Sequence, residues 1–119
     1  MKKEFREALE DSPIIAAIKD DDGLQKCLNS ESRVVFILYG DICSIAGIVK
    51  TVKSFDKIAM VHIDLINGLS SKEIAVDFLK QYTSADGIIT TRPNLIRRAR
   101  ELNLYTILRF FVIDSMAYE

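Results

Sequence analysis

The chain alternates short apolar segments with amphipathic segments, and it repeats this alternation five times. The apolar segments are nearly continuous, which is typical of strands buried on both faces of a parallel sheet. We expect five strands, at residues 13–18, 33–39, 58–65, 87–91 and 105–113. Strands and helices that alternate with short connections predict an α/β fold with right-handed crossovers.

The segments between the strands have the apolar spacing of helices that bury one face. The expected buried positions are Leu24, Cys27 and Leu28, then Ile45, Ile48, Val49, Val52 and Phe55, then Ile74, Ala75, Phe78, Leu79 and Tyr82, and finally Leu95, Ile96, Ala99 and Leu102. Ser70 and Glu73 have the spacing of a capping box, and Pro93 suits the first turn of the last helix. Residues 4–10 predict a further amphipathic helix. Residues 115–119 resemble the start of another one, which suggests a fragment of a longer protein.

Five strand–helix units allow two ways of closing the sheet. They complete an open, flavodoxin-like sheet, or they supply about five of the eight units of a TIM-barrel-like fold. We expect a single domain over residues 1–119, because a chain of this length buries one core of ordinary size.

Composition excludes several function classes. The net charge is −1, so no overall field attracts nucleic acid or a membrane. The sequence has no signal peptide and no apolar run long enough to span a bilayer. Cys27 and Cys43 match no zinc or redox spacing, which favours reduced thiols in a cytoplasmic protein. Motifs for a phosphate loop, a nucleophile elbow or a metalloprotease are missing, so we expect no catalytic residues, metal or cofactor.

Ionisable residues stand where the third and fifth strands are expected to end. His62 and Asp64 are two apart, so both side chains should leave the third strand on the same side. In α/β folds, polar groups at that end of a strand are placed to bind ligands. Arg109 lies in the fifth apolar segment and always carries its charge, so burial would require an anionic partner. That partner is either an acid such as Asp64 or a bound phosphate or carboxylate.

Two further loops carry candidate ligand-binding groups. Thr90, Thr91 and Arg92 end the fourth strand and precede a helix, where hydroxyl groups and free N–H groups suit an anion. Thr91 could instead simply cap that helix. Asp41 follows the second strand and either accepts ligand hydroxyls or caps the next helix, and Asp114 is similarly ambiguous.

One cluster of positive charge stands out. Arg97, Arg98 and Arg100 lie on the helix that follows Pro93. A solvated helix face explains such a cluster by default, and contact with nucleic acid is the weaker alternative.

Five motifs, in order, carry a resemblance to a known family. They are PIIAAIK at residues 13–19, LYGDI at 38–42, VHIDLINGL at 61–69, DGIITTR at 86–92 and RFFVIDS at 109–115. Together they resemble the glycerol-3-phosphate-responsive antiterminators, the glycerol uptake operon antiterminator regulatory proteins of bacteria. The resemblance implies a regulator with a small barrel that senses glycerol 3-phosphate and binds the leader mRNA of glycerol-utilisation genes.

The resemblance also implies a site and an assembly. The matching positions that would line the pocket mouth are Asp41, His62, Asp64, Thr90, Arg92 and Arg109. The family continues into three more strand–helix units, so the chain would be the N-terminal part of the barrel. A barrel open at both edges predicts pairing into a homo-oligomer, a rearranged sheet or aggregation.

Two other functions stay open at this point. A phosphoacceptor receiver domain has this length, with Asp20–Asp22 as its acidic cluster, Asp64 as its phosphorylated residue and Thr90 as its hydroxyl. A barrel enzyme that acts on a sugar phosphate would use His62 and Asp64 as acid and base.

Overall fold

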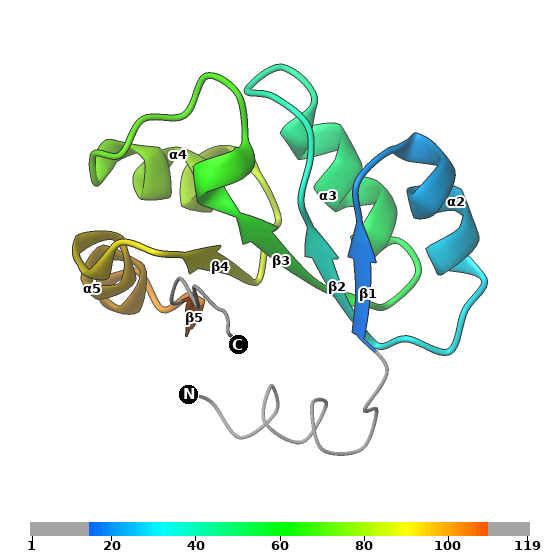
Figure 1. Ribbon diagram of the computed structural model, residues 1–119. Coiled ribbons are helices and arrows are strands. Elements are labelled where there is room, and N and C mark those ends of the chain that lie inside the picture. Colours follow the sequence, from blue (N-terminus) through cyan, green and yellow to red (C-terminus); the bar gives the residue numbers. More distant parts are fainter. Residues whose placement is uncertain (1–14, 110–119) are drawn as a thin grey trace, which may run out of the picture.

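The computed structural model describes residues 15–109, which contain one sheet of five parallel strands (Figure 1). The strands are β1 (Ile15–Ile18), β2 (Val34–Ile37), β3 (Ile58–His62), β4 (Gly87–Thr90) and β5 (Tyr105–Leu108). They lie in the sheet in their order along the chain, and each is parallel to its neighbours. The expected α/β fold is confirmed, and each strand lies within a segment that the sequence predicts.

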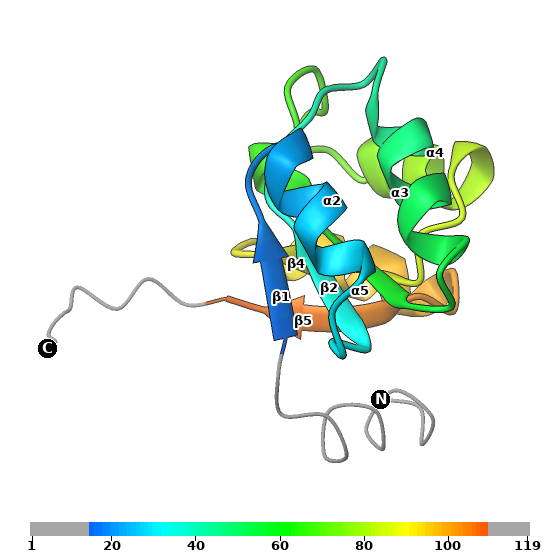
Figure 2. The same cartoon turned by 90° about the vertical axis from the view of Figure 1, so that its right-hand side faces the viewer.

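The helices that connect these strands cover one face of the sheet (Figures 1 and 2). They are α2 (Asp21–Leu28), α3 (Ile45–Lys53), α4 (Ile74–Tyr82) and α5 (Pro93–Glu101). The larger apolar core lies between this face and the helices, and a smaller cluster forms on the opposite face around Val34, Met60 and Ile89. Because both faces of the sheet are apolar, the strands are continuous apolar runs.

The strand order distinguishes the open, flavodoxin-like sheet from the TIM-barrel-like arrangement. Strands that follow the chain order, joined by right-handed crossovers, place every helix on the same face and curve the sheet around the other. This is the arrangement of consecutive units in a TIM-barrel-like fold. The flavodoxin-like order is 2-1-3-4-5 instead, so the receiver-like alternative is wrong for this chain.

Every strand except β1 ends earlier than the sequence predicts, and at β3 and β5 the difference changes the position of a candidate site residue. β3 ends at His62, and the next three residues form the 3₁₀ turn η1 (Ile63–Leu65). Asp64 therefore lies on this turn and not on the pleated strand with His62. β5 ends at Leu108, so Arg109 is exposed just beyond the strand, and it is not the buried mid-strand arginine that the pattern predicts.

The helices differ from expectation at their ends. The Ser70–Glu73 capping box is wrong, because α4 begins at Ile74 and the Ser70 hydroxyl accepts from the Lys72 N–H. Ile74 and Tyr82, at the two ends of α4, are exposed, as is Phe55 beyond the end of α3. Pro93 occupies the first turn of α5 as predicted.

Several expectations lie outside the described residues: the helices at 4–10 and 115–119, the outer ends of the first and fifth strands, and Asp114. Within residues 15–109, no helix is long and apolar enough to cross a membrane.

Candidate functional site

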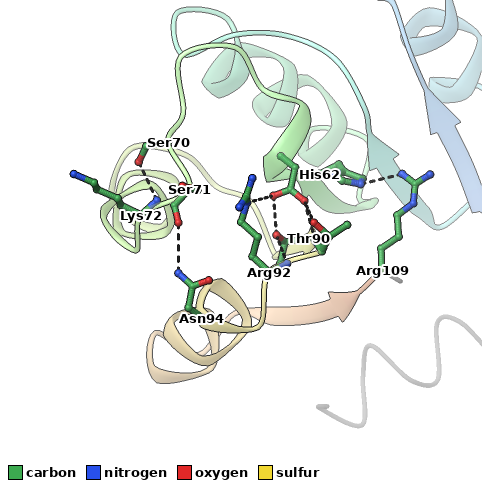
Figure 3. A network of polar contacts seen from close by, with 10 residues as sticks. His62, Ser70, Ser71, Lys72, Thr90, Arg92, Asn94 and Arg109 are labelled. Carbon is green, nitrogen blue, oxygen red and sulfur yellow. Dashed lines mark hydrogen bonds and ion pairs between the residues drawn. The ribbon is translucent and has the colours of Figure 1, made fainter. Parts of the chain in front are cut away.

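The carboxyl ends of β3, β4 and β5 lie side by side and carry the polar residues that the sequence singles out (Figure 3). His62 ends β3, Thr90 ends β4, and Arg109 follows β5. A pocket of about 700 Å³ opens at this edge. Its lining consists of His62, Asp64, Leu65, Thr91, Arg92, Pro93, Asn94 and Arg109. The volume is in the range of small-molecule sites.

Asp64 links the turn after β3 to the turn after β4 by hydrogen bonds. One carboxylate oxygen accepts from the Thr90 hydroxyl at 2.7 Å. The other accepts from the N–H of Thr91 at 2.8 Å and from its hydroxyl at 3.0 Å. The Nε of Arg92 lies 3.8 Å from the first oxygen. Thr91 therefore donates to Asp64 and does not cap the helix that follows.

These hydrogen bonds keep Asp64 ionised. Burial by itself would raise the pKa of Asp64, but the bonds from Thr91 and Thr90 together outweigh burial and hold the pKa below its ordinary value. The carboxylate is therefore a weak base, and both of its oxygens accept hydrogen bonds. This suits a structural role that links the two turns better than it suits proton abstraction.

Arg109 contacts His62 and not Asp64. Its Nη1 lies 3.0 Å from Nε2 of His62, and Figure 3 shows the two side chains reaching toward each other across the strand ends. His62 is buried, with 3% of its surface exposed. Burial lowers the pKa of His62; the charge of Asp64 opposes this effect, and the charge of Arg109 adds to it. The ring is therefore neutral at physiological pH.

The first turn of α5 completes the pocket wall. Arg92 is the N-cap residue of α5, and its side chain makes no capping hydrogen bond. The backbone N–H of Arg92 donates to the Thr90 hydroxyl at 3.1 Å, and about half of the Arg92 side-chain surface is exposed. An uncapped helix N-terminus beside two arginines creates a positive potential, which favours an anion.

The remaining candidates lie away from this pocket. Asp41 accepts from the N–H groups of Cys43 and Ser44 through a single carboxylate oxygen, so it caps the turn before α3. It is not among the residues that line the pocket. Cys27 is buried and Cys43 is exposed, and both are free thiols. Residues 15–109 contain no cluster of three or more potential metal ligands.

The three arginines of α5 differ in their surroundings. Arg98 donates to Asp77 at 2.6 Å and to Glu101 at 2.9 Å. Arg97 lies 3.4 Å from Glu73 and is largely exposed. Arg97 and Arg100 line a second hollow of about 630 Å³, which lies between α5 and β5 and shares Pro93 with the first pocket.

Sequence reasoning missed three lining residues: Leu65, Pro93 and Asn94. Leu65 was expected as the end of a strand, and Pro93 only as a helix-starting residue. Asn94 could have been found, because the first turn of a helix after a parallel strand lies at the same edge of the sheet as the strand's carboxyl end.

A family model and two solved structures indicate the family of this chain. The glycerol-3-phosphate responsive antiterminator family matches residues 14–119. The chain is 43% identical over 110 residues to YgcP, an uncharacterized protein of Escherichia coli (strain K12), and the match covers 92% of this chain and 58% of that protein.

Two solved structures are similar. The glycerol uptake operon antiterminator regulatory protein of Listeria monocytogenes aligns with a TM-score of 0.80 and 34% identity, over 87% of this chain and 56% of that one. An antiterminator-related protein of Thermotoga maritima aligns with a TM-score of 0.74 and 37% identity, over 87% of this chain and 58% of that one. The chain thus spans a little over half the length of these relatives. It belongs to the glycerol-3-phosphate responsive antiterminator family.

Proposed function

We propose that this chain is part of a cytoplasmic regulator that binds glycerol 3-phosphate as its effector and acts on the leader mRNA of glycerol-utilisation genes. The observation that carries the proposal is the pocket at the ends of β3–β5, where two arginines and an uncapped helix N-terminus converge. A phosphomonoester is a dianion with several acceptor oxygens, and arginines recognise such a group well.

Each pocket residue then has a role. Arg109 and Arg92 bind the phosphate, together with the N–H of Asn94. Pro93 has no N–H, and the N–H groups of Arg92 and Leu95 already donate to the Thr90 hydroxyl and to the Arg92 carbonyl. Thr91 and Asn94 face the glycerol hydroxyls from the pocket wall. Asp64 and Thr90 hold the turns that carry Thr91 and Arg92, and Asp41 fixes the neighbouring loop.

The role is regulatory and not catalytic. A sugar-phosphate enzyme would need Asp64 as a base, but both oxygens of Asp64 accept hydrogen bonds and its pKa is below its ordinary value. The five units are the N-terminal part of a small TIM-like barrel, and the greater length of the relatives supports this assignment. The effector is the only small molecule required, with no cofactor.

Calorimetric titration tests the effector. We expect glycerol 3-phosphate to bind, inorganic phosphate to bind more weakly, and glycerol to show no measurable binding. Arg109→Gln should weaken binding about tenfold or more, because a charge-assisted hydrogen bond contributes about 1.5–3 kcal/mol. Lys50→Gln removes the same charge from the exposed face of α3 and should change nothing. Glycerol binding as tightly as glycerol 3-phosphate would contradict the proposal.

A further inference from the structure

The contact between Arg109 and His62 fixes the protonation of the imidazole ring. A guanidinium only donates hydrogen bonds and keeps its charge in proteins. Nη1 of Arg109 lies 3.0 Å from Nε2 of His62, so Nε2 must be the acceptor and must lack a proton. The neutral ring then carries its proton on Nδ1.

The Nδ1 atom shows that this arrangement has a cost. It is fully buried and has no hydrogen-bond partner in the described structure. A buried donor without a partner destabilises a fold, and native proteins contain few of them. His62 is 3% exposed at the end of β3, so the ring has little freedom to turn Nδ1 toward solvent. Within residues 15–109, the polar contact of the ring that the structure shows is therefore the one between Nε2 and Arg109.

The partner of Arg109 is neutral, which has an electrostatic consequence. Among residues 15–109, no carboxylate forms an ion pair with Arg109. Asp64, the acid of the pocket, already accepts from Thr90 and Thr91. A carboxylate partner would hold the guanidinium but cancel its charge. An imidazole lone pair holds it and leaves the full charge for a ligand.

We propose that His62 is a positioning residue, whose unprotonated Nε2 aims Arg109 into the pocket and thereby sets the preference for an anionic ligand. The inference rests on the proposed function, because the ligand's phosphate is the group that Arg109 meets. Arg109 follows a strand end and is exposed, so without this contact its flexible side chain would sample many orientations. His62 itself binds no part of the ligand in this scheme.

Substitutions at His62 separate positioning from packing. His62→Gln keeps an acceptor oxygen near the place of Nε2, whereas His62→Leu removes the acceptor and also the unpaired Nδ1. We expect His62→Leu to fold at least as stably as the natural chain but to bind glycerol 3-phosphate and inorganic phosphate about tenfold more weakly. His62→Gln should stay within about threefold of the natural affinity.

A double-mutant cycle and nitrogen NMR complete the test. If His62 acts through Arg109, His62→Leu combined with Arg109→Gln should bind no more weakly than Arg109→Gln alone. Chemical shifts of ¹⁵N-labelled histidine at neutral pH should place the proton on Nδ1 of the single histidine. Additive losses, an unchanged affinity in His62→Leu or a proton on Nε2 would each overturn the inference and leave the proposed function standing. If the natural chain binds neither anion, both fail.

Discussion

Asp64 is the residue on which the shape of the pocket depends most. It lies on η1, yet it accepts three hydrogen bonds from two residues, Thr90 at the end of β4 and Thr91 just after it. A single side chain therefore holds together two loops that are 26 residues apart in the sequence. Its side chain is only 15% exposed, so water replaces these bonds poorly if the carboxylate is lost.

We expect Asp64→Asn to lower the free energy of unfolding by about 1–3 kcal/mol. The amide oxygen of Asn can still accept from the Thr91 N–H, but its NH₂ can face Thr90 only if that hydroxyl turns to accept. The substitution also removes the negative charge that strengthens all three hydrogen bonds. Asp41→Asn is a matched control. Asp41 uses one oxygen for both of its bonds, and Asn caps a turn about as well as Asp. Urea denaturation measures both changes, and equal losses would contradict this role for Asp64.

The difference in the free energy of unfolding between the natural chain and Asp64→Asn depends on pH, and the pKa of Asp64 gives its direction. The pKa of Asp64 is lower in the folded chain than its ordinary value of 3.8, so the unfolded chain takes up the proton first as the pH falls. The stabilisation by Asp64 is therefore complete above about pH 4 and is lost as the pH falls through the lowered pKa. The gap between the natural chain and Asp64→Asn should narrow over that range.

Residue types in the site were predictable from sequence, but their contacts were not. His62, Asp64, Thr91, Arg92 and Arg109 all line the pocket, because carboxyl ends of parallel strands meet at one edge of a sheet. Of the two kinds of partner considered for Arg109, Asp64 is not in contact with it, since Thr90 and Thr91 occupy the carboxylate and Arg109 contacts His62 instead. Which acceptor a side chain reaches depends on backbone turns such as η1, and no periodicity in the sequence encodes them.

At the scale of elements, β4 and β5 lie in close contact at Gly87. A Cβ atom on Gly87 would collide with the backbone oxygen of Tyr105 and would lie 2.7 Å from the Tyr105 Cβ. A backbone carbonyl cannot turn aside as a flexible side chain can. Glycine at this position therefore lets the two strands pair and brings Thr90 and Arg109 to the same edge.

Gly87→Ala should consequently destabilise the chain by about 1–3 kcal/mol, the cost of overpacking a tight contact. Gly47→Ala provides the opposite control. Gly47 is an exposed residue inside α3, and nothing lies within 4 Å of an added Cβ atom. Alanine there should stabilise the chain by about 0.5–1 kcal/mol, because glycine is a poor helix former. Thermal unfolding of the two variants should therefore shift in opposite directions, and a shift in the same direction would contradict this account.

Element cores were easier to predict than element ends. The apolar run that predicts β3 continues through Ile63, which is 1% exposed, although the chain has already turned into η1 at that point. Apolarity reports burial, and a buried turn has the same composition as a buried strand. Ile74 and Tyr82 fit the helical spacing of α4 but lie at its two ends, where they remain exposed.

For the molecule as a whole, α5 connects the two features on which the proposed function depends. Its first turn lines the effector pocket, and farther along the helix Arg97 and Arg100 line the second hollow. Pro93 contributes to both. The net charge of −1 supplies no general attraction for RNA, so the proposed RNA binding requires a local group of cations such as Arg97 and Arg100. Arg98 is the least available of the three, because Asp77 and Glu101 hold its guanidinium.

We expect reversal of both charges, Arg97→Glu with Arg100→Glu, to weaken binding of a glycerol-operon leader RNA. It should also reduce the slope of log affinity against log salt by about 1.4, because each contact to single-stranded RNA contributes about 0.7. Lys50→Glu, the same reversal on α3, is the control.

If α5 also transmits the effector signal, glycerol 3-phosphate should raise RNA affinity, and by linkage the RNA should raise effector affinity by the same factor. Arg109→Gln should shift this response to about tenfold higher concentrations of glycerol 3-phosphate and leave the RNA affinity measured without effector unchanged. A response at the same effector concentration as in the natural chain would place the effector elsewhere, and unchanged RNA binding after charge reversal would remove α5 from the RNA interface.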